Sequence, residues 1–196
     1  MPSLIYERKL SQQGYTAVAG VDEAGRGPLA GPLVAAAVIL PIDQAIPGLD
    51  DSKQLSAKQR NALYKKIVNI AIAFNSVVIG HQLIDELKVG QVNRLAMQQA
   101  IAGLKRKPDY ILIDGRIKLA LNIPQRTIIG GDGKASCIAA ASIVAKVTRD
   151  RLMDEYHQLY PQYRFDRHRG YGTPEHLALI RKYGLSPIHR RSFKTS

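Results

Sequence analysis

The chain has 196 residues, 45% of them hydrophobic, which is enough to bury one substantial core but short for two domains of ordinary size. We therefore expect a single domain spanning residues 1–196. The 28 Lys and Arg residues against 16 Asp and Glu give a formal net charge of +12, which favours a polyanionic partner such as nucleic acid. A basic surface that serves only solubility would have the same composition, so charge alone does not decide between these functions.

The sequence also argues against export and against a membrane anchor. Cys137, the single cysteine, cannot form an intramolecular disulfide and lies in an alanine-rich run where a buried thiol packs well. The first 13 residues carry charges without a long apolar stretch, and no segment reaches the length of a membrane span. We expect a soluble, cytoplasmic protein that works as a monomer.

In chain order, residues 15–21 and 33–40 are rich in small and β-branched residues and predict two strands, although alanine makes the second ambiguous. A glycine-rich loop separates them. Ser56 is a candidate N-cap for an amphipathic helix over residues 57–72, in which apolar residues recur at helical spacing among lysines. Residues 76–79 predict a further strand.

The second half of the chain continues this alternation. Residues 92–104 predict a largely buried helix, and the apolar residues 110–113 predict a short strand in the sheet centre, covered on both faces. Residues 126–129 predict another strand, followed by a long helix over 136–156 and a last helix over 174–181. Strands and helices in this order predict an α/β fold with helices on both faces of one sheet.

Two adjacent carboxylates, Asp22 and Glu23, follow the first predicted strand and precede the loop Gly25-Arg26-Gly27. Successive side chains of a strand point to opposite faces, so we expect the chain to turn at Glu23 if both acids serve one site. The alternative is purely structural, with Asp22 capping the following turn and Glu23 solvated.

Two further acids also lie at informative positions. Asp114 directly follows residues 110–113, where an ionised group is costly unless it is paired, solvated or bound to metal. Ligands of α/β sheets collect at strand ends, so Asp22 and Asp114 converge if their strands are neighbours. Asp132 lies between glycines just before the long helix, where turn geometry or helix-end electrostatics also explains an aspartate.

Four carboxylates in one place raise one another's pKa unless cations neutralise them. Two divalent ions would do so, and hard oxygen ligands without Cys or paired His favour Mg²⁺ or Mn²⁺ over zinc. Such a pair of ions stabilises both the attacking and the departing oxygen of a phosphodiester displacement. A basic protein with this acidic site is expected to be a nuclease or a phosphotransferase.

Nearly the whole chain, from about Gly20 to Phe193, carries a set of motifs in a fixed order: VDEAGRGPLAGPLVAAAVIL, DDSKQLS, LIDG, AASIVAKVTRDRLM, HRGYGT and HRRSF. In this combination the chain resembles bacterial ribonuclease HII, the type 2 ribonuclease H family. The resemblance implies an α/β, ribonuclease H-like fold, with a mixed five-stranded sheet flanked by helices and a helical C-terminal region.

The resemblance implies that four acids are the catalytic metal ligands: Asp22, Glu23, Asp114 and Asp132. Family members often carry a basic residue two places before the last aspartate, where this chain has Gly130, so Asp150 of the VTRD motif is the alternative fourth acid. We favour Asp132. Asp150 lies deep in a helical pattern, where pairing with Arg149, Arg151 or a backbone terminus is its expected role.

The resemblance also implies how substrate is bound. Glycines in the Gly25-Arg26-Gly27 loop let the backbone approach a sugar-phosphate closely. Similar enzymes read the 2′-OH with this backbone and with the tyrosine of GYGT, here Tyr171, which packs against the neighbouring sugar. The alternative is that Tyr171 only fills a gap beneath the last helix.

Phosphate contacts are expected from a set of polar and basic side chains: Lys53, Ser142, Lys146, and Arg190 or Arg191. A further basic group fits an ordinary solvated face at least as well: Arg164, Arg167, His168 and Arg169. Phosphate contacts set register without reading sequence, and they predict a steep salt dependence of binding.

The activity that the resemblance implies is two-metal-ion hydrolysis of the RNA strand of RNA–DNA hybrids. It includes cutting on the 5′ side of ribonucleotides embedded in duplex DNA, leaving 3′-hydroxyl and 5′-phosphate ends, and hence a part in genome maintenance. Two alternatives remain. A DNA nuclease of the same fold would cut all-DNA junctions equally, and a non-catalytic nucleic-acid-binding protein would be unaffected by Asp22→Asn, although carboxylates facing a polyanion would not help it bind.

Overall fold

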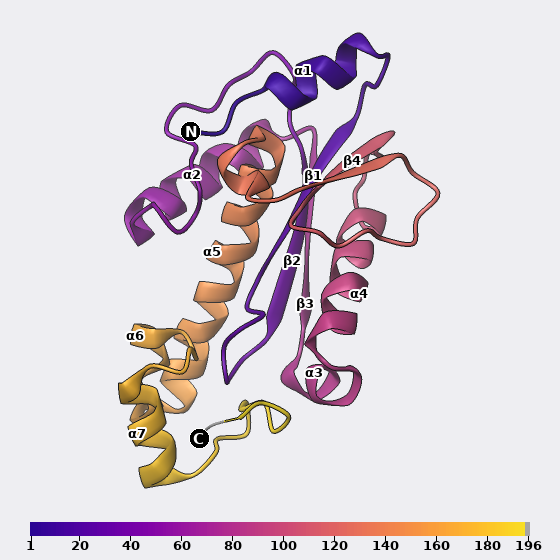
Figure 1. Ribbon diagram of the computed structural model, residues 1–196. Coiled ribbons are helices and arrows are strands. Elements are labelled where there is room, and N and C mark those ends of the chain that lie inside the picture. The colour runs from indigo at the N-terminus through magenta and orange to yellow at the C-terminus, as the bar shows by residue number, and fades with distance from the viewer. Residues whose placement is uncertain (195–196) are drawn as a thin grey trace.

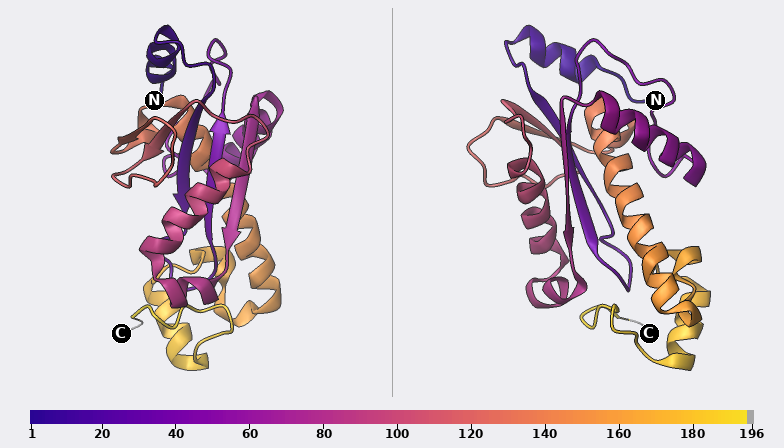
Figure 2. Two further views of the ribbon diagram at one scale, coloured as in Figure 1. Left: turned by 90° about the vertical axis from the view of Figure 1, so that its right-hand side faces the viewer. Right: turned by 180° about the vertical axis from the view of Figure 1, so that it is seen from behind.

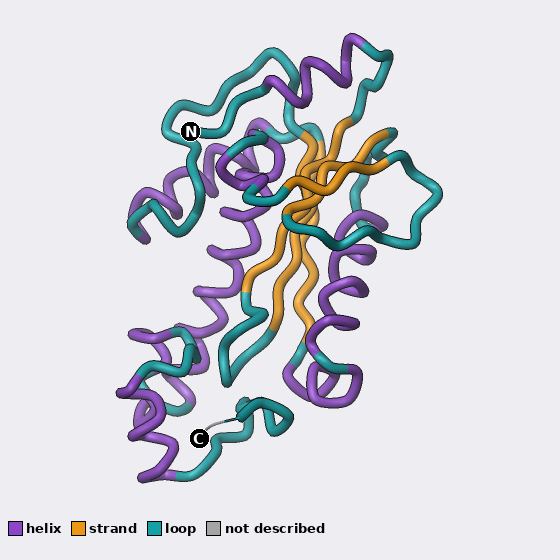
Figure 3. Tube along the Cα trace, viewed as in Figure 1, coloured by secondary structure: helices purple, strands orange, loops and turns teal. Residues whose placement is uncertain are grey.

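The computed structural model describes residues 1–194, so the last two residues of the expected 1–196 domain lie outside the described part. The strands are β1 (Val18–Ala24), β2 (Leu33–Ile39), β3 (Ala73–Ile79), β4 (Tyr110–Asp114) and β5 (Gln125–Ile128). The α-helices are α1 (Ile5–Gln12), α2 (Ala57–Ile70), α3 (His81–Leu87), α4 (Val89–Ala102), α5 (Ser136–Leu159), α6 (Phe165–His168) and α7 (Pro174–Tyr183). Figures 1 and 3 show their arrangement.

The strands form one mixed sheet in the order β3-β2-β1-β4-β5, which confirms the expected five-stranded mixed sheet. β1 is antiparallel to β2 and β2 to β3, whereas β4 is parallel to both β1 and β5. β4 is an interior strand whose Ile111, Leu112 and Ile113 are fully buried, as expected for a strand covered on both faces. The strand in the sheet centre, however, is β1.

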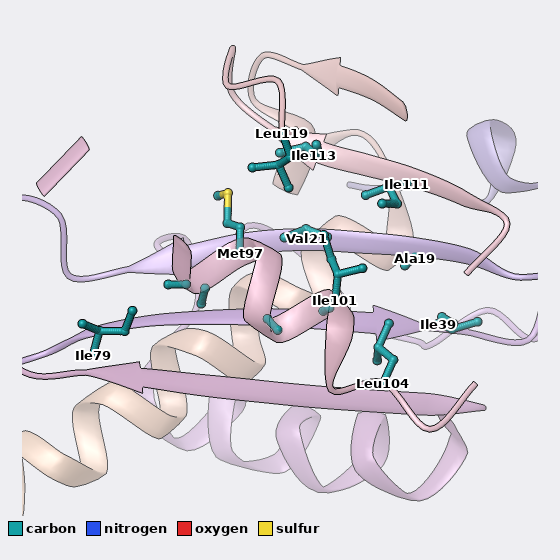
Figure 4. Packing of buried hydrophobic residues seen from close by; sticks show 14 of the residues in the cluster. Ala19, Val21, Ile39, Ile79, Met97, Ile101, Leu104, Ile111, Ile113 and Leu119 are labelled. Atoms are coloured by element: carbon teal, nitrogen blue, oxygen red, sulfur yellow. The ribbon is translucent and has the colours of Figure 1, made fainter. Parts of the chain in front are cut away.

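Helices cover both faces of the sheet. α3 and α4 lie on one face, and α2 and α5 lie on the other (Figures 1 and 2). Under α4, the core joins Ile111 and Ile113 of β4 to Met97 and Ile101 of the helix (Figure 4). Across the sheet, α5 buries its alanine-rich first half against β1 and β2. This removal of apolar surface from water is the main force that holds the layers together.

α5 approaches β1 so closely that only glycine fits at one position. A Cβ atom added to Gly20 would lie 2.1 Å from the carbonyl carbon of Cys137. β2 has three consecutive alanines at its centre, Ala35, Ala36 and Ala37, and all of the strand is buried. Its alanines form a strand because packing on two faces overrides their weak strand propensity.

Most predicted elements are present with shifted ends. The predicted helices over 57–72, 92–104, 136–156 and 174–181 correspond to α2, α4, α5 and α7. Ser56 caps α2 as expected, in a capping box with Gln59. The pattern predicts none of the short helices α1, α3 and α6, because their apolar periodicity extends over too few residues.

The C-terminal region is helical, as expected, and lies at one end of α5. Phe165 of α6 and Met153 of α5 share a buried cluster with Ile188 and Ala30. Figure 1 shows this region beside the loop that joins β1 to β2. Within residues 1–194, no helix is both long and apolar enough to pass through a bilayer.

Candidate active site

Asp22 and Glu23 lie inside β1 rather than after it, which corrects the expected strand end at residue 21. The ladder between β1 and β2 continues through Ala24. The ladder between β1 and β4 ends earlier, at Val21 opposite Ile113. Asp22 and Glu23 therefore have no paired β4 residue beside them, although both pair with β2 on the other side.

The expected turn at Glu23 is therefore absent, and the side chains alternate as in any strand. Asp22 lies on the side of Ser142 of α5, whose hydroxyl lowers the pKa of the acid, whereas Glu23 faces Asn93 of α4. Both carboxyl groups nevertheless line the same pocket. A regular strand can present both acids to one pocket here because no β4 residue pairs with β1 beyond Val21.

This pocket gathers most of the predicted site residues. Its lining includes Asp22, Glu23, Asp114, Gly25, Arg26, Gly27, Lys53, Ser142, Lys146 and Tyr171. Of the four predicted acids only Asp132 lies outside the lining, and Lys53 connects it to the pocket, with Nζ 3.2 Å from Asp132 Oδ2. Carboxylates from two parallel strands thus meet the glycine loop and the tyrosine at one place.

Asp114 and Asp132 are held by the same short turn. The Gly131 N–H donates to Asp114 Oδ1 at 2.7 Å, and Asp132 follows in the 3-10 helix Gly131–Gly133. Asp132 is only 5% exposed, and its Oδ1 accepts the N–H of Gly133. The turn therefore brings the fourth acid next to the end of β4.

The site carries unbalanced negative charge. Burial, followed by repulsion from Glu23 and Asp114, raises the pKa of Asp22 well above its usual value. Burial likewise raises the pKa of Glu23, against the attraction of Arg26. The pKa of Asp114 is raised by burial and by Asp132, against a backbone hydrogen bond. These carboxyl groups are costly to ionise until a cation neutralises them.

Lys53 is a cation placed beside the acids. Its Nζ lies 3.2 Å from Asp132 Oδ2 and 3.9 Å from Asp51 Oδ1. Burial lowers the pKa of Lys53, but the attraction of Asp132 and Asp51 outweighs it and the pKa is raised. Since 75% of its side chain is exposed, the ammonium group is also accessible to a phosphate.

Within residues 1–194, no three His, Cys, Asp or Glu side chains are already close enough to enclose a metal ion. The chemistry of the donors nevertheless fits hard divalent cations, because the lining offers carboxylates without thiolate or imidazole. The mutual repulsion that raises the pKa of Asp22 and Asp114 is what such cations would relieve. Asp22, Glu23 and Asp114 in the lining, with Asp132 beside Lys53, are the residues that could hold such cations.

Asp150 lies apart from this group and does not line the pocket. Its Oδ1 accepts a hydrogen bond from Lys146 Nζ at 2.6 Å, and its Oδ2 lies 3.7 Å from Arg60. The expected partners, Arg149 and Arg151, are thus replaced by Lys146 and Arg60. Asp150 is therefore paired with basic side chains, as expected, but the partners are not the ones that were predicted.

The Gly25-Arg26-Gly27 loop faces Tyr171. Gly25 has a φ of +97°, a region that favours glycine, and a Cβ atom there would lie 2.3 Å from Arg149 Nε. A Cβ atom on Gly27 would lie 4.0 Å from the Tyr171 ring. Tyr171 is 42% exposed and lines the pocket, which disfavours the alternative that it only fills a gap beneath the last helix.

Two of the predicted phosphate contacts are engaged within the protein. The Ser142 hydroxyl lies 2.9 Å from that of Ser52, and Lys146 pairs with Asp150. Arg190 is fully buried and donates to backbone carbonyls of the β1–β2 loop, so of the two expected alternatives the exposed Arg191 stays the candidate for a phosphate contact. Backbone carbonyls accept from four of the five N–H donors of this buried guanidinium.

The basic group near residue 165 is only partly a solvated face. Arg164 and Arg167 both lie near Glu175, with nitrogen–oxygen distances of 2.9 and 3.8 Å, and Arg169 pairs with Asp154. His168, in contrast, is buried and its Nε2 lies 2.8 Å from the carbonyl oxygen of Tyr163. The arginines form ion pairs with acids near the surface, as expected for a solvated face, whereas His168 belongs to the core.

The sequence model of the family described as Ribonuclease HII matches residues 19–196. The chain belongs to the ribonuclease HII family. It is therefore a ribonuclease H, a hydrolase that acts on RNA in RNA–DNA hybrids.

Two curated relatives extend this result over nearly the whole chain. A ribonuclease HII of Endomicrobium trichonymphae is 51% identical over 96% of this chain and 90% of that protein. A ribonuclease HII of Geobacillus thermodenitrificans is 52% identical over 96% of this chain and 72% of that protein.

Solved structures confirm the ribonuclease H-like α/β fold. The ribonuclease H2 from Pyrococcus horikoshii superposes with a TM-score of 0.80 at 30% identity, covering 92% of this chain and 95% of that one. Bst-RNase HIII in complex with Mn²⁺ gives a TM-score of 0.68 at 18% identity over 91% of this chain and 67% of that one, a likeness that shows the fold alone.

The sequence pattern does not single out three residues that support the site of this ribonuclease HII: Ser52, Asn93 and Arg149. Asn93 is fully buried and faces Glu23, although neither amide atom makes a hydrogen bond of normal geometry within residues 1–194. A lone polar residue on the apolar face of the predicted helix 92–104 is a signal that could have found it. No comparable signal marks Arg149 as buried.

Proposed function

We propose that the protein hydrolyses the RNA strand of RNA–DNA hybrids and also cuts duplex DNA on the 5′ side of an embedded ribonucleotide. The products are 3′-hydroxyl and 5′-phosphate ends, and the cellular role is removal of ribonucleotides from DNA. The observation that carries the proposal is the shared pocket, which places Asp22, Glu23 and Asp114 beside the Gly25-Arg26-Gly27 loop and Tyr171. A phosphodiester and the ribose next to it can therefore be held together.

The proposed cofactor is a pair of divalent ions, Mg²⁺ or Mn²⁺, held by Asp22, Glu23, Asp114 and Asp132. When bound, such ions supply an activated water and neutralise the charge that develops on the departing 3′-oxygen. The raised pKa values of Asp22, Glu23 and Asp114 support this, because a nearby cation would offset the cost of ionising these acids.

The remaining pocket residues are proposed to bind and orient the duplex. Lys53 and Lys146 attract the phosphates, and the Ser142 hydroxyl, which lowers the pKa of Asp22, favours the ionised form of that acid. The glycine loop approaches the 2′-OH with its backbone, and the exposed Tyr171 ring packs against the neighbouring sugar. One chain supplies the whole pocket, which is consistent with a monomer as the working unit.

The test is a cleavage assay with three labelled duplexes: an RNA–DNA hybrid, a DNA duplex with one ribonucleotide, and the same duplex in all-DNA form. We expect Mg²⁺- or Mn²⁺-dependent cutting of the first two and none of the third, with the cut mapped to the 5′ side of the single ribonucleotide. Equal cutting of the all-DNA duplex would favour a DNA nuclease instead. Intact substrates with every metal would reject the proposal.

A further inference from the structure

The segment between α7 and the C-terminus is tied to the β1–β2 loop by backbone hydrogen bonds. The Arg190 N–H donates to Leu29 O at 2.8 Å, and the Gly31 N–H donates to Ile188 O at 2.9 Å. Figure 1 shows the two segments together at one end of the molecule, far apart in sequence. The loop that carries Gly25-Arg26-Gly27 therefore rests on the C-terminal segment.

The Arg190 side chain reaches under this loop and binds its carbonyl groups. Nη2 donates to Gly25 O at 2.6 Å, and Nη1 donates to Arg26 O at 3.1 Å. Nε donates to Gly31 O at 3.0 Å, and Nη2 lies 3.2 Å from Pro32 O. One guanidinium thus holds both ends of the loop.

Burying the charge of Arg190 costs free energy, so its position under the loop calls for a physical explanation. Arg190 is fully buried, and within residues 1–194 it forms no ion pair with a carboxylate within 4.0 Å. Burial, and then repulsion by Arg149, lowers the pKa of Arg190 to about 9. A buried charge is tolerated only when its donors are satisfied, and the planar five-donor fork of arginine matches several carbonyls where a lysine ammonium does not.

The geometry of the peptide group shows how the hydrogen bonds from Arg190 orient the loop. In a planar trans peptide the C=O and the following N–H point in opposite directions. Holding the Gly25 and Arg26 carbonyls toward the buried guanidinium therefore directs the N–H groups of Arg26 and Gly27 the other way, toward the pocket that both residues line. Among residues 1–194 these two N–H groups have no protein acceptor, so they are free for a ligand.

The same segment also holds the backbone at Tyr171. His189 Nε2 lies 3.0 Å from His176 Nε2, and His176 Nδ1 lies 2.9 Å from Tyr171 O. The Leu29 N–H donates to Gly170 O at 2.8 Å, which joins the loop to the tyrosine directly. Neighbouring residues of one segment, His189 and Arg190, thus support both groups that flank the expected ribose position.

We propose that Arg190 is a positioning residue for ribose recognition. It fixes the peptide planes of the Gly25-Arg26-Gly27 loop so that the N–H groups of Arg26 and Gly27 are presented to the 2′-OH opposite Tyr171. The inference rests on the proposed function, since it concerns how the same pocket distinguishes ribose from deoxyribose. It predicts that disturbing Arg190 removes that distinction while the acids and the phosphate contacts stay in place.

The first test compares Arg190→Lys with two control variants. Arg181→Ala removes an exposed cation in the last turn of α7, and Ile67→Ala weakens the core under α2, away from the loop. Affinity is measured with Ca²⁺ in place of Mg²⁺ or Mn²⁺, in samples whose duplexes are verified to stay uncut, for the single-ribonucleotide duplex and its all-DNA form. Cleavage kinetics and thermal unfolding are recorded for the same samples.

We expect Arg190→Lys to lose most of the preference for the ribonucleotide duplex and to lower kcat by about 10- to 100-fold, while affinity for the all-DNA duplex changes less than about twofold. Both controls should keep the wild-type preference, even though Ile67→Ala is less stable. An unchanged preference in folded Arg190→Lys overturns the inference. A wild type that shows no preference rejects the proposed function itself.

The second test needs no variant and therefore does not depend on the folding of Arg190→Lys. Backbone amide signals are assigned by NMR, and the ribonucleotide and all-DNA duplexes are added in turn with Ca²⁺. We expect the N–H signals of Arg26 and Gly27 to shift and to gain protection from exchange with the ribonucleotide duplex alone. The same response to both duplexes, or to neither, contradicts the inference.

Discussion

At the scale of single residues, the site depends on carboxyl groups that are costly in isolation. Asp22 is 5% exposed, and its pKa is raised by burial and by the neighbouring acids. Strongly shifted ionisable groups in a cleft are typical of functional sites, where a ligand offsets their cost. Electrostatic strain in the metal-free protein is therefore expected to favour cation binding.

The gathering of Asp22, Glu23 and Asp114 could be predicted from the sequence, because acids at the ends of apolar strands converge when the strands are parallel neighbours. The burial of Arg149 and Arg190 could not be predicted. In a chain with 28 Lys and Arg residues, nothing local distinguishes a guanidinium that faces water from one that binds distant carbonyl groups.

The choice between Asp132 and Asp150 as fourth acid gives a residue-scale prediction. We expect Asp132→Asn to lower kcat at least about 100-fold, because an amide is a weaker ligand for a hard cation than a carboxylate. Asp150→Asn should keep activity within about threefold but lower the free energy of unfolding by about 1–3 kcal/mol, since Lys146 and Arg60 lose their partner. Cleavage kinetics and urea unfolding of both variants check this, and the opposite order of activities would make Asp150 the ligand.

At the scale of elements, long periodic helices could be predicted, and elements that depend on distant contacts could not. α1 has no side-chain hydrogen bond at its N-cap and is held by tertiary contacts instead. Its Glu7 accepts the N–H of Cys137 at 2.8 Å, and its Leu10 is buried. The predicted end of the first strand, at residue 21, is wrong for a similar reason. Pairing with β2 extends β1 through two acids that have little strand propensity.

The close packing of α5 on β1 can be tested with a matched pair of glycine variants. Gly20→Ala places a Cβ atom 2.1 Å from the Cys137 carbonyl carbon, and since backbone must move, we expect the free energy of unfolding to fall by about 3 kcal/mol. Gly90→Ala in α4 meets nothing within 4 Å and should raise it by about 0.5–1 kcal/mol through helix propensity. Denaturant unfolding measures both, and a neutral Gly20→Ala would contradict the described packing.

The histidines around α7 give a prediction for pH dependence. Burial lowers the pKa of His176 and of His189 to about 4, so the folded protein favours their neutral forms. Their contribution to stability is fully present above the unfolded pKa of about 6.5 and is lost as the pH falls toward 4. The raised pKa values of Asp22 and Glu23 act in the opposite direction, so the informative quantity is a difference between variants.

We therefore expect the acid-side fall in melting temperature between pH 6.5 and 4.5 to be shallower in His189→Gln than in the wild type. His157→Gln is the control, because His157 is partly exposed beside Asp166, outside this buried group. Thermal unfolding across this pH range provides the measurement. Identical slopes for the wild type and His189→Gln would show that the buried imidazoles do not govern acid stability.

At the scale of the whole molecule, a strongly basic chain contains a site built around acids. The chain has a net charge of +12, yet the pocket is built around acids whose pKa values are raised. Basic residues attract the polyanionic duplex, and divalent cations make the acidic pocket compatible with it. The sheet provides the acids, and the C-terminal segment supports the loop beside them.

The most direct test of this account is the cleavage rate of Asp22→Asn on the single-ribonucleotide duplex, measured at saturating duplex and compared with the wild type. If strand ends deliver carboxylates that hold divalent ions against the scissile bond, kcat falls by at least about 1,000-fold while the affinity for the duplex is retained. A kcat within about tenfold of the wild type, with the same cut position, would contradict the account.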